Sequence, residues 1–253
     1  MLKHILDAHG GTLPPDVRVA FMNTGGECEE SLQFVAQCGE LWQVPITWLE
    51  FDPEAPDRTR RTSFATASRA NEPFTALIRA RAFLPNPLMR FCTTELKIRP
   101  CKVFMLAEGF EHWTTVIGYR ADEPRRVAKM RAANAAGKER WDQVAPLADG
   151  GVTKKDVVAW WAVQPFDLRL PSVSGRTPAG NCKLCFLKAR STIMELMREH
   201  PEWADWYVAM ERTTGARFRK DWPNYAELRR LALMSPPLPF DPHDEGISCF
   251  CGD

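Results

Sequence analysis

The chain has 253 residues, with 33 lysines and arginines, 32 aspartates and glutamates, and a formal net charge of +1. This length can bury a substantial core, as one large domain or as a domain with an appendage. The near-zero charge excludes a global field that would attract nucleic acid or an anionic membrane, so any anion site must be a local cluster. Apolar runs such as residues 157–163 are too short to span a bilayer. Because the first residues also lack the apolar core of a signal peptide, we predict a cytoplasmic protein.

Strands and helices are predicted to alternate in the first half of the chain. The spacing of Leu2, Ile5 and Leu6 predicts a helix that starts at Met1. Strands are predicted from apolar or β-branched runs at 17–22, 45–51 and 113–119, and helices after the first strand, over 74–83 and over 98–107. This alternation indicates an α/β fold with a mostly parallel, doubly wound sheet covered by helices on both faces.

The second half is predicted to be mainly helical. Residues 121–150 are charged and rich in alanine and glycine, which indicates a surface helix and a long loop. Thr153 is a plausible amino-terminal cap of a helix, and helix is expected from Cys182 to about Leu233. The chain is therefore divided into an α/β domain over 1–150, a helical cysteine-bearing region over 151–235 and a Pro-rich tail over 236–253.

Eight cysteines are present, and in a reducing compartment they indicate metal ligation, redox chemistry or burial rather than disulfides. Cys28 and Cys38 lie in a predicted amphipathic helix, where we expect them to be buried. Cys182 and Cys185 are separated by two residues at a predicted helix start, a spacing that can ligate one metal centre.

A pair of cysteines does not complete a tetrahedral metal site, so further ligands must come from elsewhere. Cys92 is the first candidate, because its neighbours indicate the same ligand-binding edge of the sheet. Cys249 or Cys251 from the tail is the candidate for a fourth ligand, ahead of Cys101. With three cysteines only, one iron of a cluster would stay open to an exogenous ligand.

Polar segments follow two of the predicted strands. Asn23, Thr24 and Gly25 form a turn of small residues at the carboxyl end of the first strand, where open α/β sheets bind ligands. A purely structural turn explains the same residues equally well. Arg120 and Arg125 follow Gly118 after the third strand, and arginine offers a planar fork for phosphate or sulfate; a charged helix start on the surface is the alternative.

A third basic segment precedes the helix expected over 98–107. Lys97 and Arg99 lie there near Cys92, at a helix end that favours anions. This composition suits a phosphate or sulfate group beside a thiolate, whose pKa the cations would lower. A solvated basic loop with an incidental cysteine is the alternative interpretation.

Taken in order, these segments resemble the phosphoadenosine-phosphosulfate reductase family. The resemblance extends over about residues 1–235 and is carried by FMNTGGECEESLQFV, RFCTTELKIRP, VIGYRADEPRR and TKKDVVAWW. The GNCKLCFLK segment, together with the ending CFCGD, resembles a phage- and prophage-associated branch with iron–sulfur cysteines. The ordered combination is more specific than any one segment.

The resemblance implies a sheet of the adenine nucleotide alpha-hydrolase type with a helical C-terminal region. It implies that an adenylated sulfate or ATP binds at the carboxyl edge, with Mg²⁺ as a further ligand. The implied nucleotide- and anion-binding residues are Asn23, Thr24, Gly25, Lys97, Arg99, Gly118, Arg120 and Arg125. The implied ligands of an iron–sulfur cluster, of the 4Fe-4S type, are Cys92, Cys182, Cys185 and Cys251.

Two departures from the family pattern matter. The Ser-Gly-Gly-x-Asp-Ser phosphate loop and the central strand before it are absent ahead of Met1, which we interpret as a missing amino-terminal segment, since an empty central position would expose two strand edges. The segment from Cys249 to Cys251 is only loosely similar to the Glu-Cys-Gly ending that carries the family's catalytic cysteine.

Three functions are compatible with these observations. The first is a reductase of an adenylated sulfate, in which Cys249 or Cys251 attacks the sulfate and a thiol reductant restores the enzyme. The second is an ATP-dependent sulfur transferase that acts on nucleic acid or another acceptor. The third is a non-catalytic module with structural zinc on Cys92, Cys182 and Cys185. The expected partners are the nucleotide, a reductant or acceptor and a second copy in a homodimer, without a membrane.

Overall fold

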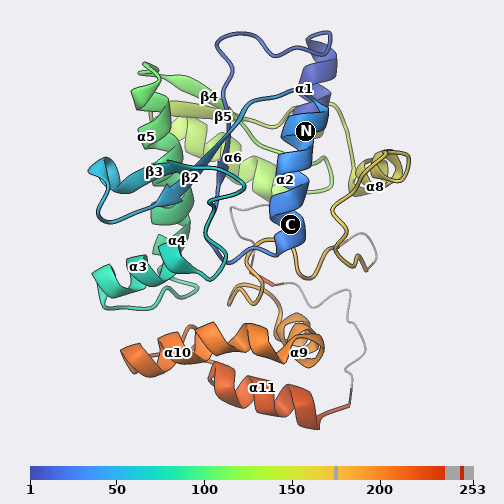
Figure 1. The fold of residues 1–253 in the computed structure, drawn as a ribbon. Helices are drawn as coiled ribbons and strands as arrows, with labels where there is room; N and C mark the ends of the chain where they lie inside the picture. Colours follow the sequence, from blue (N-terminus) through green and yellow to red (C-terminus); the bar gives the residue numbers. More distant parts are fainter. Residues whose placement is uncertain (174–175, 237–245, 248–253) are drawn as a thin grey trace.

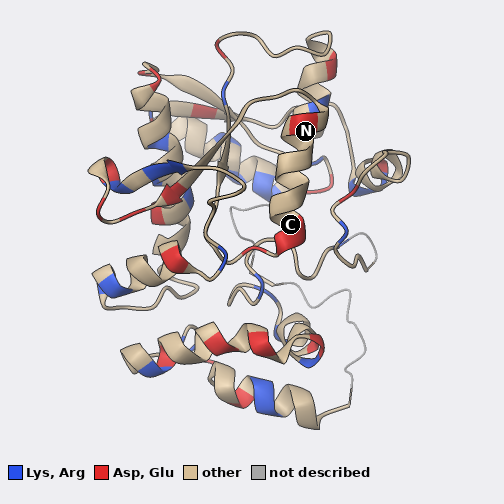
Figure 2. Cartoon of the chain, viewed as in Figure 1, with Lys and Arg blue, Asp and Glu red and all other residues tan. Residues whose placement is uncertain are grey.

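Figure 1 shows the computed structural model of the chain, which describes residues 1–173, 176–236 and 246–247. The chain forms a mixed α/β part, drawn in the upper half of the figure, and a helical part beneath it. Basic and acidic residues are interspersed along both parts, in keeping with the net charge of +1 (Figure 2). None of the described helices is long and apolar enough to cross a bilayer.

The described strands form two sheets. In the first sheet β1 (Val19–Met22) pairs in parallel with β2 (Ile46–Phe51), and β2 pairs antiparallel with β3 (Thr59–Thr62). In the second sheet β4 (Trp113–Val116) pairs in parallel with β5 (Trp141–Val144). Within the described residues β1 therefore has one paired edge, and so does β4.

Helices surround both sheets and form the lower part. The upper part contains α1 (Leu2–Ala8), α2 (Glu29–Leu41), η1 (Pro56–Arg58), α3 (Glu72–Arg81), α4 (Phe91–Thr93), the π-helix η2 (Thr94–Ile98), α5 (Arg99–Ala107), α6 (Pro124–Ala136), α7 (Pro146–Asp149) and α8 (Lys154–Trp161). The lower part contains α9 (Arg190–Glu199), η3 (Pro201–Trp203), α10 (Ala204–Thr214) and α11 (Tyr225–Met234).

Helix α5 joins the two sheets through a shared core. Its buried Phe104 and Met105 pack with Leu49 of β2, and half-buried Met22 of β1 and Trp113 of β4 pack against the same cluster. Apolar side chains from both sheets are thus buried against one helix. The hydrophobic effect stabilises this arrangement of the two sheets.

The mixed α/β class is confirmed, but two strands were not predicted. β3 has the sequence TRRT, whose polar residues suit an exposed edge rather than a buried strand. β5 has the sequence WDQV and lies in the segment that we expected to be a loop. Both strands lack the apolar runs from which strands were predicted. The single doubly wound sheet remains a prediction.

The helix predicted from Cys182 is wrong over its first turns. Residues 182–189 form turns, and α9 begins only at Arg190. Asn181, directly before the cysteines, has a left-handed backbone with φ of 60°. The predicted cap at Thr153 is confirmed, because Thr153 and Asp156 form a reciprocal capping box.

Candidate functional site

The turn after β1 is held by a buried polar network. Asn23, which is fully buried, donates from Nδ2 to Glu50 Oε1 at 2.6 Å and to the Ser68 carbonyl at 2.8 Å. Its Oδ1 accepts from the Gly25 amide at 3.2 Å. Glu50 is also fully buried and accepts from the Ser68 amide and hydroxyl and from Arg60. The Asn23 amide therefore fixes the shape of the turn.

Two glycines in this turn allow a second loop to approach closely. Gly25 has φ of 78°, and a Cβ there would lie 3.1 Å from the Asn71 backbone. A Cβ at Gly26 would lie 2.7 Å from Asn71 Oδ1, and the Asn71 amide donates to the Gly25 carbonyl at 2.9 Å. A side chain at Gly25 would press on the backbone of the loop that precedes α3 and would strain the positive φ, so this position favours glycine. At Gly26 the contact is with the end of the Asn71 side chain, which can move.

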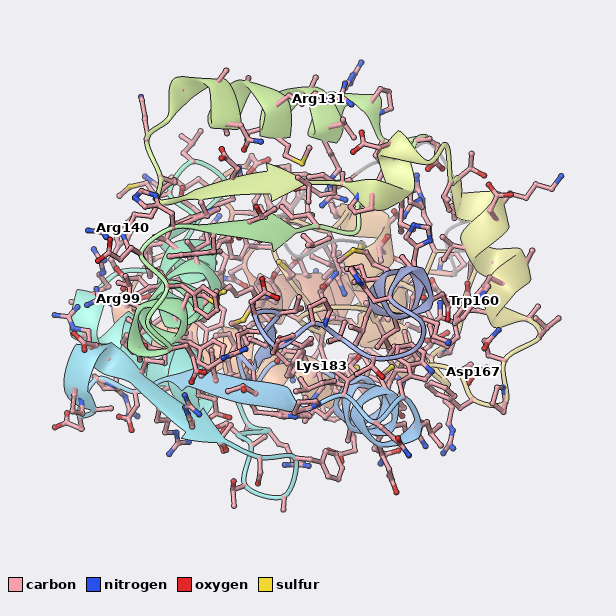
Figure 3. All side chains as sticks on the ribbon, turned by 90° about the horizontal axis from the view of Figure 1, so that it is seen from above. Arg99, Arg131, Arg140, Trp160, Asp167 and Lys183 are labelled. Atoms are coloured by element: carbon pink, nitrogen blue, oxygen red, sulfur yellow. The ribbon has the colours of Figure 1, made fainter. Side chains whose placement is uncertain are left out.

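The loop that carries Cys182 and Cys185 docks on the same turn. The Lys183 amide donates to the Gly26 carbonyl at 2.9 Å. Thr24 Oγ1 lies 3.5 Å from Cys182 Sγ and also hydrogen-bonds to the buried Glu27 carboxylate at 2.8 Å. The predicted nucleotide turn and the predicted metal-binding pair are thus neighbours. Figure 3, seen from above, labels Lys183 near the centre of the molecule.

Lys188 holds the cysteine loop in one conformation. Its Nζ donates to the carbonyls of Pro178, Gly180 and Lys183 at 2.6, 2.9 and 2.9 Å. The buried Tyr225 of α11 donates its hydroxyl to the Leu184 carbonyl at 2.8 Å. These contacts satisfy the carbonyls of an irregular segment and attach it to the helical part.

Both thiols of the loop lie near a buried phenol. Burial raises the pKa of Tyr207 well above its usual value, and the negative charge of Cys182 and Cys185 thiolates raises it further. Cys92 and Cys185 are both half-buried against the same large hydrophobic cluster. Within the described residues, however, no three His, Cys, Asp or Glu side chains form a group that could hold a metal ion.

The donor set therefore fits a metal centre in part. Cys182 and Cys185 offer two half-buried thiols from one loop, and in the part of the chain that the structure describes Cys92 does not complete a group of three with them. Cys249 and Cys251, the predicted nucleophiles and further ligand candidates, lie outside the described residues. The four-cysteine ligand set remains a prediction.

The other three described cysteines belong to the protein interior. Burial raises the pKa of Cys28 to about 11 and of Cys38 to about 12, and it also raises the pKa of Cys101. Buried thiols with raised pKa values stay protonated at neutral pH and are poor nucleophiles. The predicted burial of Cys28 and Cys38 is confirmed.

The predicted anion-binding residues Arg99 and Arg120 have different neighbours in the fold. Arg99 lies 3.5 Å from Glu95 Oε2 and donates to the Asp57 carbonyl at 3.4 Å. Figure 3 shows Arg99 at the opposite side of the molecule from Trp160 of α8. Half-buried Lys97 lies in the π-helix η2 that precedes Arg99, a type of helix that often occurs at functional sites.

Arg120 lies in the loop after β4, next to the start of α8. Its Nε donates to Asp122 at 3.0 Å, and its amide donates to Glu123 at 2.9 Å. Arg125 is exposed at the start of α6. A Cβ at Gly118 would lie 3.7 Å from the Met1 side chain, so the start of the chain lies beside this loop. Among the described contacts, Arg99 and Arg120 have no partner in common, and their joint binding of an anion stays a prediction.

Several residues of this region were not predicted from the sequence. Glu50 is a carboxylate inside the apolar strand sequence PITWLEF, and such a residue signals a buried partner. Asn71 and Lys188 gave no comparable signal, because their contacts depend on loops that are distant in sequence.

Comparisons with known proteins identify one phage relative. The chain is 32% identical over 186 residues to a protein of Escherichia phage lambda named "Uncharacterized nin region protein ORF290". The match covers 70% of this chain and 59% of that relative, so the chain spans less than two thirds of the relative's length. No model of a protein family and no solved structure matches the chain.

Proposed function

We propose that this protein is an enzyme of sulfur chemistry, similar to phosphoadenosine-phosphosulfate reductases, that binds an adenylated sulfate or ATP. The observation that supports this most is the 3.5 Å contact between Thr24 Oγ1 and Cys182 Sγ. It puts a thiol beside the turn at the carboxyl end of a parallel strand, where nucleotides bind in open α/β sheets.

The doubly wound sheet is part of the same proposal. A further strand between β1 and β4 would join the two sheets into one. Two observations support this: β1 and β4 each pair on one side within the described residues, and α5 packs against both through Met22 and Trp113. Unpaired backbone groups at two facing edges favour the addition of a strand.

Each part of the site has a role in this proposal. The Asn23–Glu50 network keeps the turn in shape, so that the backbone around Thr24 and Gly25 can approach the nucleotide. Arg120 would bind sulfate or phosphate. Cys182 and Cys185 would hold an iron–sulfur cluster together with Cys92 and Cys251, and such a cluster supplies a centre for electron or sulfur transfer.

For an adenylated sulfate, the overall reaction would be a two-electron reduction. A cysteine thiolate attacks the sulfur, the bond to the nucleotide phosphate breaks, and a thiosulfonate remains on the protein. Two further thiol groups from a reductant release sulfite and are oxidised to a disulfide. Cys249 and Cys251 are the proposed nucleophiles.

An ATP-dependent sulfur transferase is the second candidate. It is favoured by two contacts that bring the cysteine pair to the nucleotide turn, that of Cys182 Sγ with Thr24 Oγ1 and that of the Lys183 amide with the Gly26 carbonyl. In this reaction ATP would adenylate an acceptor such as nucleic acid and release pyrophosphate. Sulfite release and acceptor-dependent pyrophosphate release therefore distinguish the two reactions.

Anaerobic purification tests the cluster, and calorimetry tests the nucleotide. We expect iron and sulfide in the wild-type protein, loss of both in Cys182→Ala and Cys185→Ala, and retention in Cys101→Ala, whose thiol lies in a different core cluster. ATP or an adenylated sulfate should bind the wild-type protein. A colourless protein with stoichiometric zinc would contradict the cluster, and absence of adenine nucleotide binding would contradict the proposed function.

A further inference from the structure

The described residues of the tail contact the end of the cysteine loop. We infer that Gly246 and Ile247 are positioning residues, a tail anchor that bonds the tail to the loop and keeps the tail cysteines within reach of Cys185. The inference rests on the proposed function for the roles of those cysteines. It adds the residues that would bring the thiols of tail and loop to one place.

A backbone hydrogen bond joins the two segments. The Ile247 amide donates to the Leu187 carbonyl at 2.6 Å. The bond uses only backbone atoms, and Ile247 itself is 40% exposed. Residue 247 can therefore change its side chain and keep the bond, unless the amide hydrogen itself is removed.

Gly246 lets the two backbones approach each other. A Cβ at Gly246 would lie 2.5 Å from the Leu187 carbonyl oxygen, 2.8 Å from the Ala189 nitrogen and 3.0 Å from the Lys188 carbonyl carbon. All three are backbone atoms, which cannot turn aside as the end of a long side chain can. The φ of Gly246 lies outside the left-handed region. Glycine is thus required here by the close approach and not by the conformation, and alanine would push the tail off the loop.

The segment that receives the tail is itself fixed. Lys188 donates from Nζ to three backbone carbonyls of the cysteine loop and the residues before it, and its amide donates to the Cys185 carbonyl at 2.9 Å. Leu187 and Ala189 are 3% and 6% exposed. The tail is therefore bonded to a buried, hydrogen-bonded segment that also holds Cys185.

The chain lengths on either side of the bond are short. Cys185 precedes Leu187 by two residues, and Cys249 follows Ile247 by two. Extended backbone spans at most about 3.6 Å per residue, so two residues reach about 7 Å from the anchoring bond. The Cα atoms of a thiol pair that forms a disulfide are about 4.4–6.8 Å apart, a separation that these two short spans allow.

Without the anchor the connection would be much longer. Before Gly246, the last described residue of the tail is Pro236, whose carbonyl accepts from Arg198 at 3.2 Å. Thirteen residues lead from Pro236 to Cys249, and such a length can span about 45 Å. The effective concentration of one group near another falls as the connection between them lengthens. The tail anchor therefore raises the local concentration of the tail thiols at Cys185.

Amide hydrogen exchange of the full chain tests the bond directly. In the wild-type protein the Ile247 amide should exchange more slowly than in an unstructured peptide. Gly246→Ala should make it exchange about tenfold faster, because the displaced backbone weakens the hydrogen bond. Gly109→Ala is the control: its positive φ strains the backbone, but a Cβ there has open space, so the Ile247 amide should exchange as in the wild type.

Disulfide formation tests the positioning role. In a Cys182→Ser background the loop pair cannot link to itself, and diamide takes two electrons and two protons from two thiols to join them. Mass spectrometry should then find Cys185 linked to a tail cysteine. Ile247→Pro removes the amide donor and should slow this link about tenfold. Ile247→Ala keeps the donor and should link at the rate of the background protein.

The outcomes separate this inference from the proposed function. Fast exchange of the Ile247 amide in the wild type, or equal link rates in Ile247→Pro and Ile247→Ala, overturns the tail anchor even if iron and adenine nucleotide bind. A protected amide and a link that depends on it, in a protein that binds neither iron nor adenine nucleotide, supports the tail anchor and contradicts the proposed function. Residues 246 and 247 are exposed, so these variants should leave the rest of the fold intact.

Discussion

The turn after β1 and the loop after β4 follow parallel strands in the same way, yet their polar residues are used differently. After β1, fully buried Asn23 and Glu50 hydrogen-bond to each other and to neighbouring backbone. After β4, Arg120 is 19% exposed and pairs with Asp122 and Glu123 near further cations. The first arrangement buries its polar groups in a network that fixes the backbone, and the second keeps its charges in ion pairs near the surface.

The buried network predicts the largest effect. Glu50→Ala should lower the free energy of unfolding by about 3–5 kcal/mol, because Arg60, Asn23 and Ser68 would lose their common acceptor. Urea unfolding of the variant and of Glu54→Ala, an exposed carboxylate after the same strand, measures this. A change below about 1 kcal/mol in Glu50→Ala would show that the network is not what fixes the turn.

The glycine turn predicts an intermediate effect. Gly25→Ala should lower the free energy of unfolding by about 1–3 kcal/mol through its positive φ, with an added contribution from contact with Asn71. Gly109→Ala is the matched control, since Gly109 has φ of 88° with open space around it. The difference between the two variants measures the packing of the turn; equal effects would mean that Asn71 yields to the new methyl group.

The smallest effect concerns the surface ion pairs of Glu108. Hydrogen bonds from Arg18 and Arg61 lower the pKa of Glu108 below its ordinary value of 4.5. A lowered pKa in the folded protein stabilises it above pH 4.5, and this contribution is lost as the pH falls through the folded value. In Glu108→Gln the free energy of unfolding, measured by urea unfolding at several pH values, should therefore fall less steeply as the pH is lowered below 4.5. Glu111→Gln, which changes an exposed neighbour, is the control and should show the pH dependence of the wild type.

The apolar pattern of the sequence predicted the elements that are buried. Strands at 19–22, 46–51 and 113–116 lie within the predicted runs, and helices α3 and α5 lie close to their predicted ranges. The edge strands β3 and β5 were missed, because TRRT and WDQV place polar residues where solvent reaches them. Hydrophobic periodicity indicates which residues are buried. An edge strand with polar side chains has little hydrophobic periodicity, so the pattern does not predict it.

The site was predicted in part. The rule that ligands bind at the carboxyl ends of strands predicted the turn at Asn23, Thr24 and Gly25 as a ligand-binding position. The contact of Thr24 with Cys182 was not predicted. The partners of Arg99 did not follow from the sequence, because the Asp57 carbonyl belongs to a segment whose position depends on the tertiary fold.

The attachment of the cysteine loop has a consequence for the lower helices. The segment between α8 and α9 is bonded to the Gly26 carbonyl at one point and to Tyr225 of α11 at another. A ligand that binds only when the turn after β1 is formed disfavours local unfolding of the turn and of the segments bonded to it. Amide hydrogens of α9 and α11 should then exchange more slowly with solvent when the upper part is occupied, although these helices do not touch the ligand.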